Sequence, residues 1–161
     1  MFRPVARVKQ VIPEETCIDI LKREKRGVMS LLGDDNYPYG IPMNHFYREE
    51  DGCLYFHGAG KGHRIDAMRK HDKASFCVFG DGVRDENHPQ PWALHFQSVI
   101  VFGRLEEVND HDLAIELSRE LCYKFTNDED YIAYEIRYSG PGVHCIRMRP
   151  EHITGKTVVE R

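Results

Sequence analysis

The apolar segments of this chain follow one another through short polar turns and do not alternate regularly with helices. Six runs are typical of strands: 28–32, 39–48, 53–57, 74–79, 94–108 and 143–148. A doubly wound parallel sheet would need strands and helices in regular alternation. The observed order instead predicts a mostly β fold, an antiparallel barrel or sandwich with helices packed outside.

Helical patterns interrupt these strands. They are expected between Pro13 and Gly27 and over 60–70, 110–125 and 128–138. Pro13 can occupy the first turn of the first helix, and Gly27 is a natural stop. Pro42 indicates that its strand is an edge strand or a bulged one, and Gly103 indicates a bulge. The tail from Pro150 shows no usable pattern.

Length, charge and cysteine spacing set broad limits. A chain of 161 residues suits one domain, 1–161, with one substantial core. The net charge of -4 argues against binding to nucleic acid. No run approaches the ~20 apolar residues that span a bilayer, and the N-terminus lacks a secretory signal, so we expect a cytoplasmic protein without membrane contact. The five cysteines form no C-x-x-C pair, which predicts scattered, reduced thiols.

The segment Tyr55–Asp66, YFHGAGKGHRID, carries the clearest chemical signal. It leads from a predicted strand through three alternating glycines into a predicted helix, and glycine lets the backbone approach a ligand closely. The free N–H groups of a helix start favour an anion, and Lys61, His63 and Arg64 add positive charge there. The pattern is neither a Walker A motif nor G-x-G-x-x-G. It predicts a phosphate site; the alternative is a glycine-rich turn with exposed basic residues.

Two strands and one loop offer weaker signals. The bent segment 39–45 could present backbone groups to a planar ring, or it could be a barrel strand with a bulge. Ser98 precedes an apolar block and could donate to a phosphate or a ring edge, or it could face solvent. The loop 81–93 is long enough to be functional, and its Trp92 either covers a ring or is half-buried at the surface. The pair Glu106–Glu107 is typical of surface charge.

Together these segments resemble the pyridoxamine-phosphate-oxidase-like FMN-binding split barrels, in particular the nitroimidazole resistance branch. The resemblance rests on PYGIP-M-N at 38–44, LYFHGAGKGHRID at 54–66 and SVIVFGR at 98–104, and it covers about residues 3–148. It implies a six-stranded antiparallel split barrel with outer helices, and a homodimer with two FMN sites at its interface. The basic residues that grip the substrate phosphate in pyridoxamine phosphate oxidases have no counterpart here, which argues against vitamin B6 oxidation.

The resemblance also implies two groups of FMN-binding residues. Those expected to hold the phosphate are Lys61, Gly62, His63 and Arg64. Those expected along the ring and ribityl chain are Met43, Asn44, His57 and Gly58, with Ser98 and Val99 approaching from the long strand. A histidine in the site is linked to activity in the nitroimidazole resistance branch, and His57 is the matching position. It is the candidate catalytic residue; alternatively, it only hydrogen-bonds the flavin or the backbone.

Three functions remain open at this stage. The first is an FMN-dependent reductase of small electron-poor molecules such as nitroimidazoles, in which the flavin carries the redox chemistry. The second is a non-catalytic flavin carrier or sensor, because this fold hosts proteins of many kinds. The third is a haem-handling protein with His45, His57 or His144 as axial ligand. No metal site is expected, since the histidine spacing matches no common ligand pattern.

Overall fold

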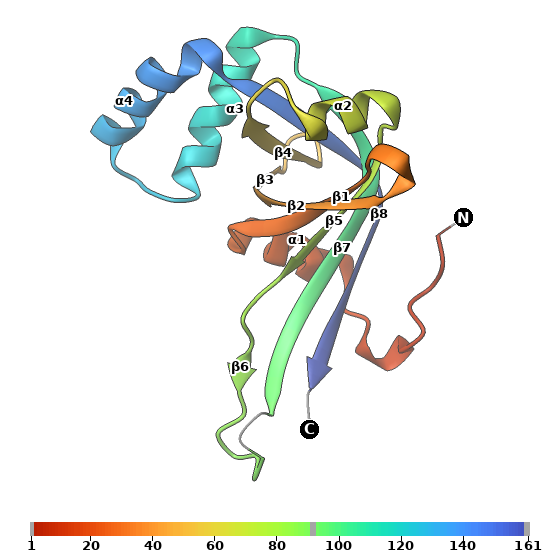
Figure 1. Cartoon of the computed structure of the whole chain (residues 1–161). Helices are drawn as coiled ribbons and strands as arrows, with labels where there is room; N and C mark the ends of the chain where they lie inside the picture. The colour runs from red at the N-terminus through yellow and green to blue at the C-terminus, as the bar shows by residue number, and fades with distance from the viewer. Residues whose placement is uncertain (1, 91–92, 160–161) are drawn as a thin grey trace.

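The computed structural model of the protein describes residues 2–90 and 93–159 and shows one curled antiparallel sheet with helices around it (Figure 1). The strands are β1 Arg26–Leu32, β2 Pro38–Asn44, β3 Phe46–Arg48, β4 Cys53–Gly58, β5 Lys73–Phe79, β6 Val83–Arg84, β7 Leu94–Glu107 and β8 His144–Val159. The α-helices are α1 Glu14–Arg23, α2 His63–Lys70, α3 His111–Tyr123 and α4 Glu129–Ser139. Trp92 lies outside the described residues.

The order of the strands explains why the sheet curls. Its hydrogen-bonded path runs β2-β1-β5-β7-β8-β4-β3, and β6 pairs with β7. β2 and β3 therefore stand at opposite ends of the path, although only His45 separates them in the chain. In a flat sheet the two ends would be several strand spacings of about 4.8 Å apart. The sheet must bend until its ends meet, which produces a half-barrel.

The fold contains more strands than the sequence predicts, and it is mixed α/β rather than mostly β. The unpatterned tail is the second half of β8, which pairs with β7 as far as Val159. The two strands project beyond the helices as a long ribbon (Figure 1). Their register shifts between Phe102 and Gly103, opposite Pro150. This bulge and the proline interrupt the alternation that would have marked a strand.

The segment predicted as one long strand around Pro42 is two strands that belong to different ends of the sheet. β2 pairs with β1 and is an edge strand, as Pro42 predicts. Only β3 forms the predicted hairpin with β4, because the chain turns at the fully buried His45. Gly27 is not the helix stop: α1 ends at Arg23, and Gly27 lies in β1. A Cβ there would come within 2.6 Å of the Cys77 carbonyl oxygen.

The core is divided between two apolar clusters on the two faces of β4. Leu54 and Phe56 belong to the larger cluster, which α1 and α2 cover. Cys53 and Tyr55 belong to the smaller cluster, which α3 covers. Since side chains alternate along a strand, His57 continues the α3 face of β4. No α-helix in the described parts of the chain is both long and apolar enough to cross a membrane.

Candidate functional site

The predicted phosphate segment forms an open turn between β4 and α2. Gly62 caps the start of α2 with a φ of 102°, a conformation that glycine adopts without strain. No side chain caps this helix start, and a Cβ on Gly62 would meet nothing within 4 Å. The first N–H groups of α2 therefore lie at an accessible surface, where the helix dipole favours a negative charge.

Arg64 lies half-buried beside this turn without a carboxylate partner among residues 2–90 and 93–159. Its guanidinium donates to Met43 Sδ at 3.3 Å and to the Ala59 carbonyl oxygen at 2.9 Å. Its Nε is buried and has no hydrogen-bond acceptor. A Cβ on Gly58 would lie 2.7 Å from Arg64 Nη2, so a glycine is needed for this packing. Burial lowers the pKa of Arg64, because the cation is poorly solvated where it lies.

The other two basic residues of the turn, His63 and Lys61, differ from Arg64 in their contacts. The ring of His63 stacks on Tyr39 with a centroid distance of 4.1 Å. Its Nε2 is 3.3 Å from the backbone nitrogen of Asp34, so that nitrogen is engaged in holding the β1–β2 turn. Lys61 is exposed and has no ion pair within the described parts of the chain. Of the predicted phosphate ligands, Arg64 and Lys61 are available to an anion, and His63 is largely engaged.

A chain of contacts holds the turn against the sheet. A Cβ on Gly60 would lie 3.1 Å from the ring of His144, so the turn packs closely on that histidine. His144 Nε2 lies 2.7 Å from Glu107, which also accepts two hydrogen bonds from Arg69 of α2. These partners lower the pKa of Glu107 to about 2. Glu107, predicted as surface charge, thus links α2, β7 and β8, a role that local sequence does not reveal.

Met43 and Asn44 point to opposite sides of β2. Met43 is buried in the larger cluster, where its sulfur accepts the hydrogen bond from Arg64. Asn44 accepts a hydrogen bond from Arg26 at 3.0 Å and lines a cavity together with His57. The ring residues predicted from the sequence therefore divide into one group beside Arg64 and another group beside α3 and α4.

His57 lies at the edge of that cavity, and its side chain is exposed. Desolvation by the surrounding protein, followed by the charge of Arg64, lowers the pKa of His57. The imidazole is therefore neutral at neutral pH, and a neutral imidazole still donates through one of its two nitrogens.

The cavity has a volume of about 210 Å³ and lies between α3, α4 and the ends of β2 and β4. Its apolar wall consists of Leu121, Phe125, Ile136 and Val143. Tyr131 and Glu135 of α4 add polar groups. None of these α3 and α4 residues was predicted from the sequence, because helical periodicity identifies a helix but not the cavity that it borders. A larger hollow of about 560 Å³ beside Glu24 and His95 contains none of the candidate residues.

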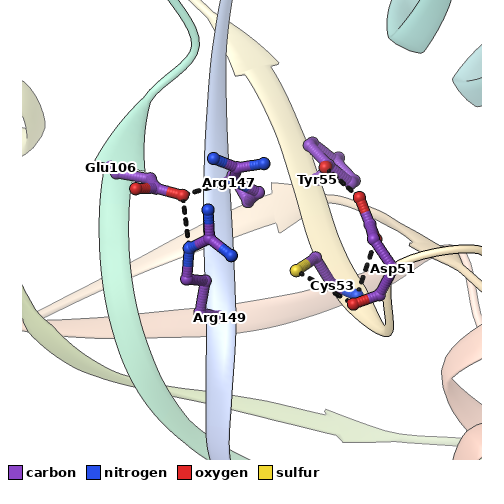
Figure 2. Close-up of polar contacts among 6 residues, drawn as sticks. All are labelled: Asp51, Cys53, Tyr55, Glu106, Arg147 and Arg149. Atoms are coloured by element: carbon purple, nitrogen blue, oxygen red, sulfur yellow. Dashed lines mark hydrogen bonds and ion pairs between the residues drawn. The ribbon is translucent and has the colours of Figure 1, made fainter.

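Two groups of polar contacts lie on β8 and at the start of β4, the strand that carries His57. Figure 2 shows Arg147 and Arg149 of β8 directed toward Glu106 of β7, and both donate to the same carboxylate oxygen. On the neighbouring strand, Asp51 accepts a hydrogen bond of 2.5 Å from Tyr55 and a second one from the Cys53 backbone (Figure 2). Burial and the bond to Asp51 raise the pKa of Tyr55 to about 12, so the phenol remains a donor. The first contacts join β7 to β8, and the second hold the turn before β4 against that strand.

Ser98 and Val99 lie on β7, three strands from β2 along the sheet. Val99 is fully buried in the larger cluster, and Ser98 pairs with Phe79 and Lys156. About 30 Å of extended strand separates Ser98 from Glu107 at the end of β7 beside the turn, whereas the strand register places Ser98 about three strand spacings, or about 14 Å, from Asn44 of β2.

His45, the third histidine considered as a haem ligand, is held in the core, and the cysteines are free. His45 is fully buried against Phe76, and its Nε2 lies 2.9 Å from the Leu21 carbonyl oxygen. All five cysteines are free thiols. Within residues 2–90 and 93–159, no group of three His, Cys, Asp or Glu side chains is placed to hold a metal ion.

A half-barrel closed at β2 and β3, with a glycine-rich turn leading into a basic helix start, can be compared with known families. The family profile described as pyridoxamine 5'-phosphate oxidase matches residues 13–157. The chain belongs to this split-barrel family. Its members are flavin-binding split barrels, so flavin binding is the property that the family suggests. No curated protein sequence matches the chain.

Solved structures share the fold at low sequence identity. A proposed 5-nitroimidazole antibiotic resistance protein from Bacteroides thetaiotaomicron is 18% identical with a TM-score of 0.76, covering 91% of this chain and 86% of its own. A conserved hypothetical protein from Mycobacterium tuberculosis is 14% identical with a TM-score of 0.78, over 95% and 90%. The FAD and haem binding protein from Mycobacterium smegmatis is 19% identical with a TM-score of 0.72, over 95% and 74%. At these identities the likeness concerns the fold.

Proposed function

We propose that the protein binds FMN through its phosphate at the start of α2 and reduces small electron-poor molecules such as nitroimidazoles. The observation that carries the proposal is Arg64, a half-buried cation without a carboxylate partner in the described residues. Its Nε has no acceptor. An anion at this point would supply the missing acceptor and the missing charge at the same time.

The residues present fit a flavin phosphate. Gly58 leaves the space that Arg64 fills, and Gly62 leaves the helix start open. Lys61 adds a second, exposed cation. When bound, FMN would supply the redox chemistry, and the protein would need only to bind it, orient it and exclude competing reactions.

His57 is the proposed hydrogen-bond donor to the negative charge that develops on the substrate. It lies between the phosphate site and the cavity under α3 and α4. Its lowered pKa keeps the ring neutral, and the ring can donate an N–H to a nitro oxygen. Of the three histidines considered as haem ligands, His45 is buried and His144 is bonded to Glu107. These positions support flavin binding over haem binding.

We also propose a homodimer with the flavin at the interface. The start of α2 is an open surface that one chain does not enclose. Sedimentation should give a dimer at micromolar concentration; a monomer that retains bound FMN would contradict this proposal.

The phosphate assignment is tested by titrating flavin-free protein with FMN and with riboflavin. Loss of one charge-assisted hydrogen bond costs about 1.5–3 kcal/mol, or roughly 10–150-fold in affinity. We expect Arg64→Gln to weaken FMN by this factor and to leave riboflavin affinity nearly unchanged. Arg104→Gln is the matched control, since Asp72 and Glu151 already hold its guanidinium. Equal FMN affinity of Arg64→Gln and the parent would exclude Arg64 as the phosphate ligand.

Reduction is tested separately from binding. FMN-loaded protein is reduced without oxygen, and its oxidation by a nitroimidazole is followed in the flavin absorbance. The reductase proposal requires faster oxidation than that of free reduced FMN. Tight FMN binding without this acceleration would favour a flavin carrier or sensor.

A further inference from the structure

The cavity between α3, α4 and β4 has a size that selects its occupant. An engineered cavity of about 150 Å³ holds one benzene ring, whereas pockets for drug-sized ligands begin at about 300 Å³. The volume of about 210 Å³ lies between these limits. It admits one aromatic ring with a small substituent, whereas the three fused rings of a flavin would extend beyond its walls.

The packing of α4 explains why this cavity exists. Among the residues of α4 only Ile132 is buried, so the helix does not pack closely on the sheet. Glu135 and Ile136 are half-buried and line the space that remains between α4 and α3. From α3, Leu121 and Cys122 complete this side of the wall.

The charges of the cavity wall favour a neutral occupant over an anionic one. Among the residues that the structure describes, no lysine or arginine lines the cavity, and Glu135 is its one carboxylate. His57 is the titratable group from β4, and its lowered pKa keeps it neutral. An anionic ring would therefore meet a carboxylate and no cation, whereas a neutral ring would meet apolar side chains with a few polar groups at the edge.

We propose that this cavity binds a small, neutral, single-ring aromatic molecule and is the substrate subsite of the protein. The second half of this statement rests on the proposed function, because Asn44 and His57 are shared by the cavity and the predicted flavin site. The first half, the binding itself, needs no flavin.

Two cysteines provide a direct test in flavin-free protein. Cys122 lines the cavity, and Cys77 on β5 does not; both are half-buried. Burial raises the pKa of both thiols, so alkylation is followed at alkaline pH. The probes are nitrobenzene, which is neutral, and benzoate, which has nearly the same shape and a negative charge. The nitrobenzene Kd is first measured by NMR titration.

At ten times its Kd, nitrobenzene should slow the alkylation of Cys122 about tenfold, because only the free protein reacts. Cys77 should react at an unchanged rate, and benzoate at the same concentration should protect neither thiol. Equal slowing of alkylation at both thiols, or no slowing at either, would contradict the proposed binding site. Equal protection by benzoate would overturn the selection against anions, and protection of Cys122 by FMN would assign the cavity to the flavin instead.

Two variants on α4 test where the ligand binds. Ser139 lines the cavity and Ala133 does not, although both are exposed on the same helix. Ser139→Phe should abolish the protection of Cys122 by nitrobenzene, and Ala133→Phe should retain it. Unchanged protection in Ser139→Phe would place the ligand elsewhere. Because the measurements with nitrobenzene and benzoate involve no FMN, failure of the phosphate assignment at Arg64 would leave their outcome unaffected.

Discussion

His45, at the point where the half-barrel closes, should make the protein lose stability in mild acid. Its ring is fully buried, and Lys124 Nζ lies 3.3 Å from its Nε2. Burial, with the charge of Lys124, lowers the pKa of His45 to about 3. In the unfolded chain the pKa of a histidine is about 6.5. As the pH falls from 6.5 toward 3, the unfolded state therefore takes up a proton that the native state does not, and native stability falls.

The expected size of this effect follows from linkage. One proton difference changes the free energy of unfolding by about 1.4 kcal/mol per pH unit, so a change from pH 7 to pH 4.5 should cost about 2.5 kcal/mol. Urea unfolding at a series of pH values measures it in the parent and in His45→Gln. Glutamine does not titrate and can still donate to the Leu21 carbonyl.

The difference between the two profiles isolates His45, because carboxylates that titrate in the same range contribute equally to both proteins. We expect the profile of His45→Gln to be flatter by about 2.5 kcal/mol over this interval. Parallel profiles would refute the reasoning, since they would mean that His45 binds its proton equally well in the native and unfolded states.

Three further changes test the site and the sheet. Gly58→Ala would place a Cβ 2.7 Å from Arg64 Nη2 and should weaken FMN binding with little change in the urea midpoint, because a flexible side-chain end can move away. Gly103→Ala would collide with the Arg149 carbonyl oxygen, which cannot move as easily, and should lower stability by about 1–3 kcal/mol in the same assay. His57→Ala, loaded with FMN and reduced, should be oxidised by a nitroimidazole about 100- to 1,000-fold more slowly, the cost of losing one hydrogen-bond donor to developing negative charge; an unchanged rate would remove His57 from catalysis.

Local chemistry in the sequence was sufficient to predict most individual elements. Pro13 and the charges around it identified α1, and the leucine spacing of 110–125 identified α3. The glycine-rich segment predicted a turn into a helix, because only glycine allows the backbone to come so close to other groups. These features depend on residues near one another in the chain, so no knowledge of tertiary contacts was needed.

The closing of the sheet was decided by contacts between residues far apart. Pairing sends β2 to one end of the sheet and β3 to the other, and nothing in the spacing around His45 indicates this. The second half of β8 is a strand because β7 lies beside it, despite the bulge and the proline that conceal its pattern. The count of strands was therefore too low.

The candidate site also combines features that the sequence predicts with features that only the tertiary structure decides. The sequence by itself determined that the turn before α2 is rich in glycine and positive charge, because these are properties of the residues themselves. Only the tertiary structure decided which charge is available: His63 stacks on Tyr39, whereas Arg64 lies half-buried without a carboxylate partner in the described residues. The cavity beside His57 likewise exists only because α3, α4 and β4 meet, and a volume between three elements has no signature within any one of them.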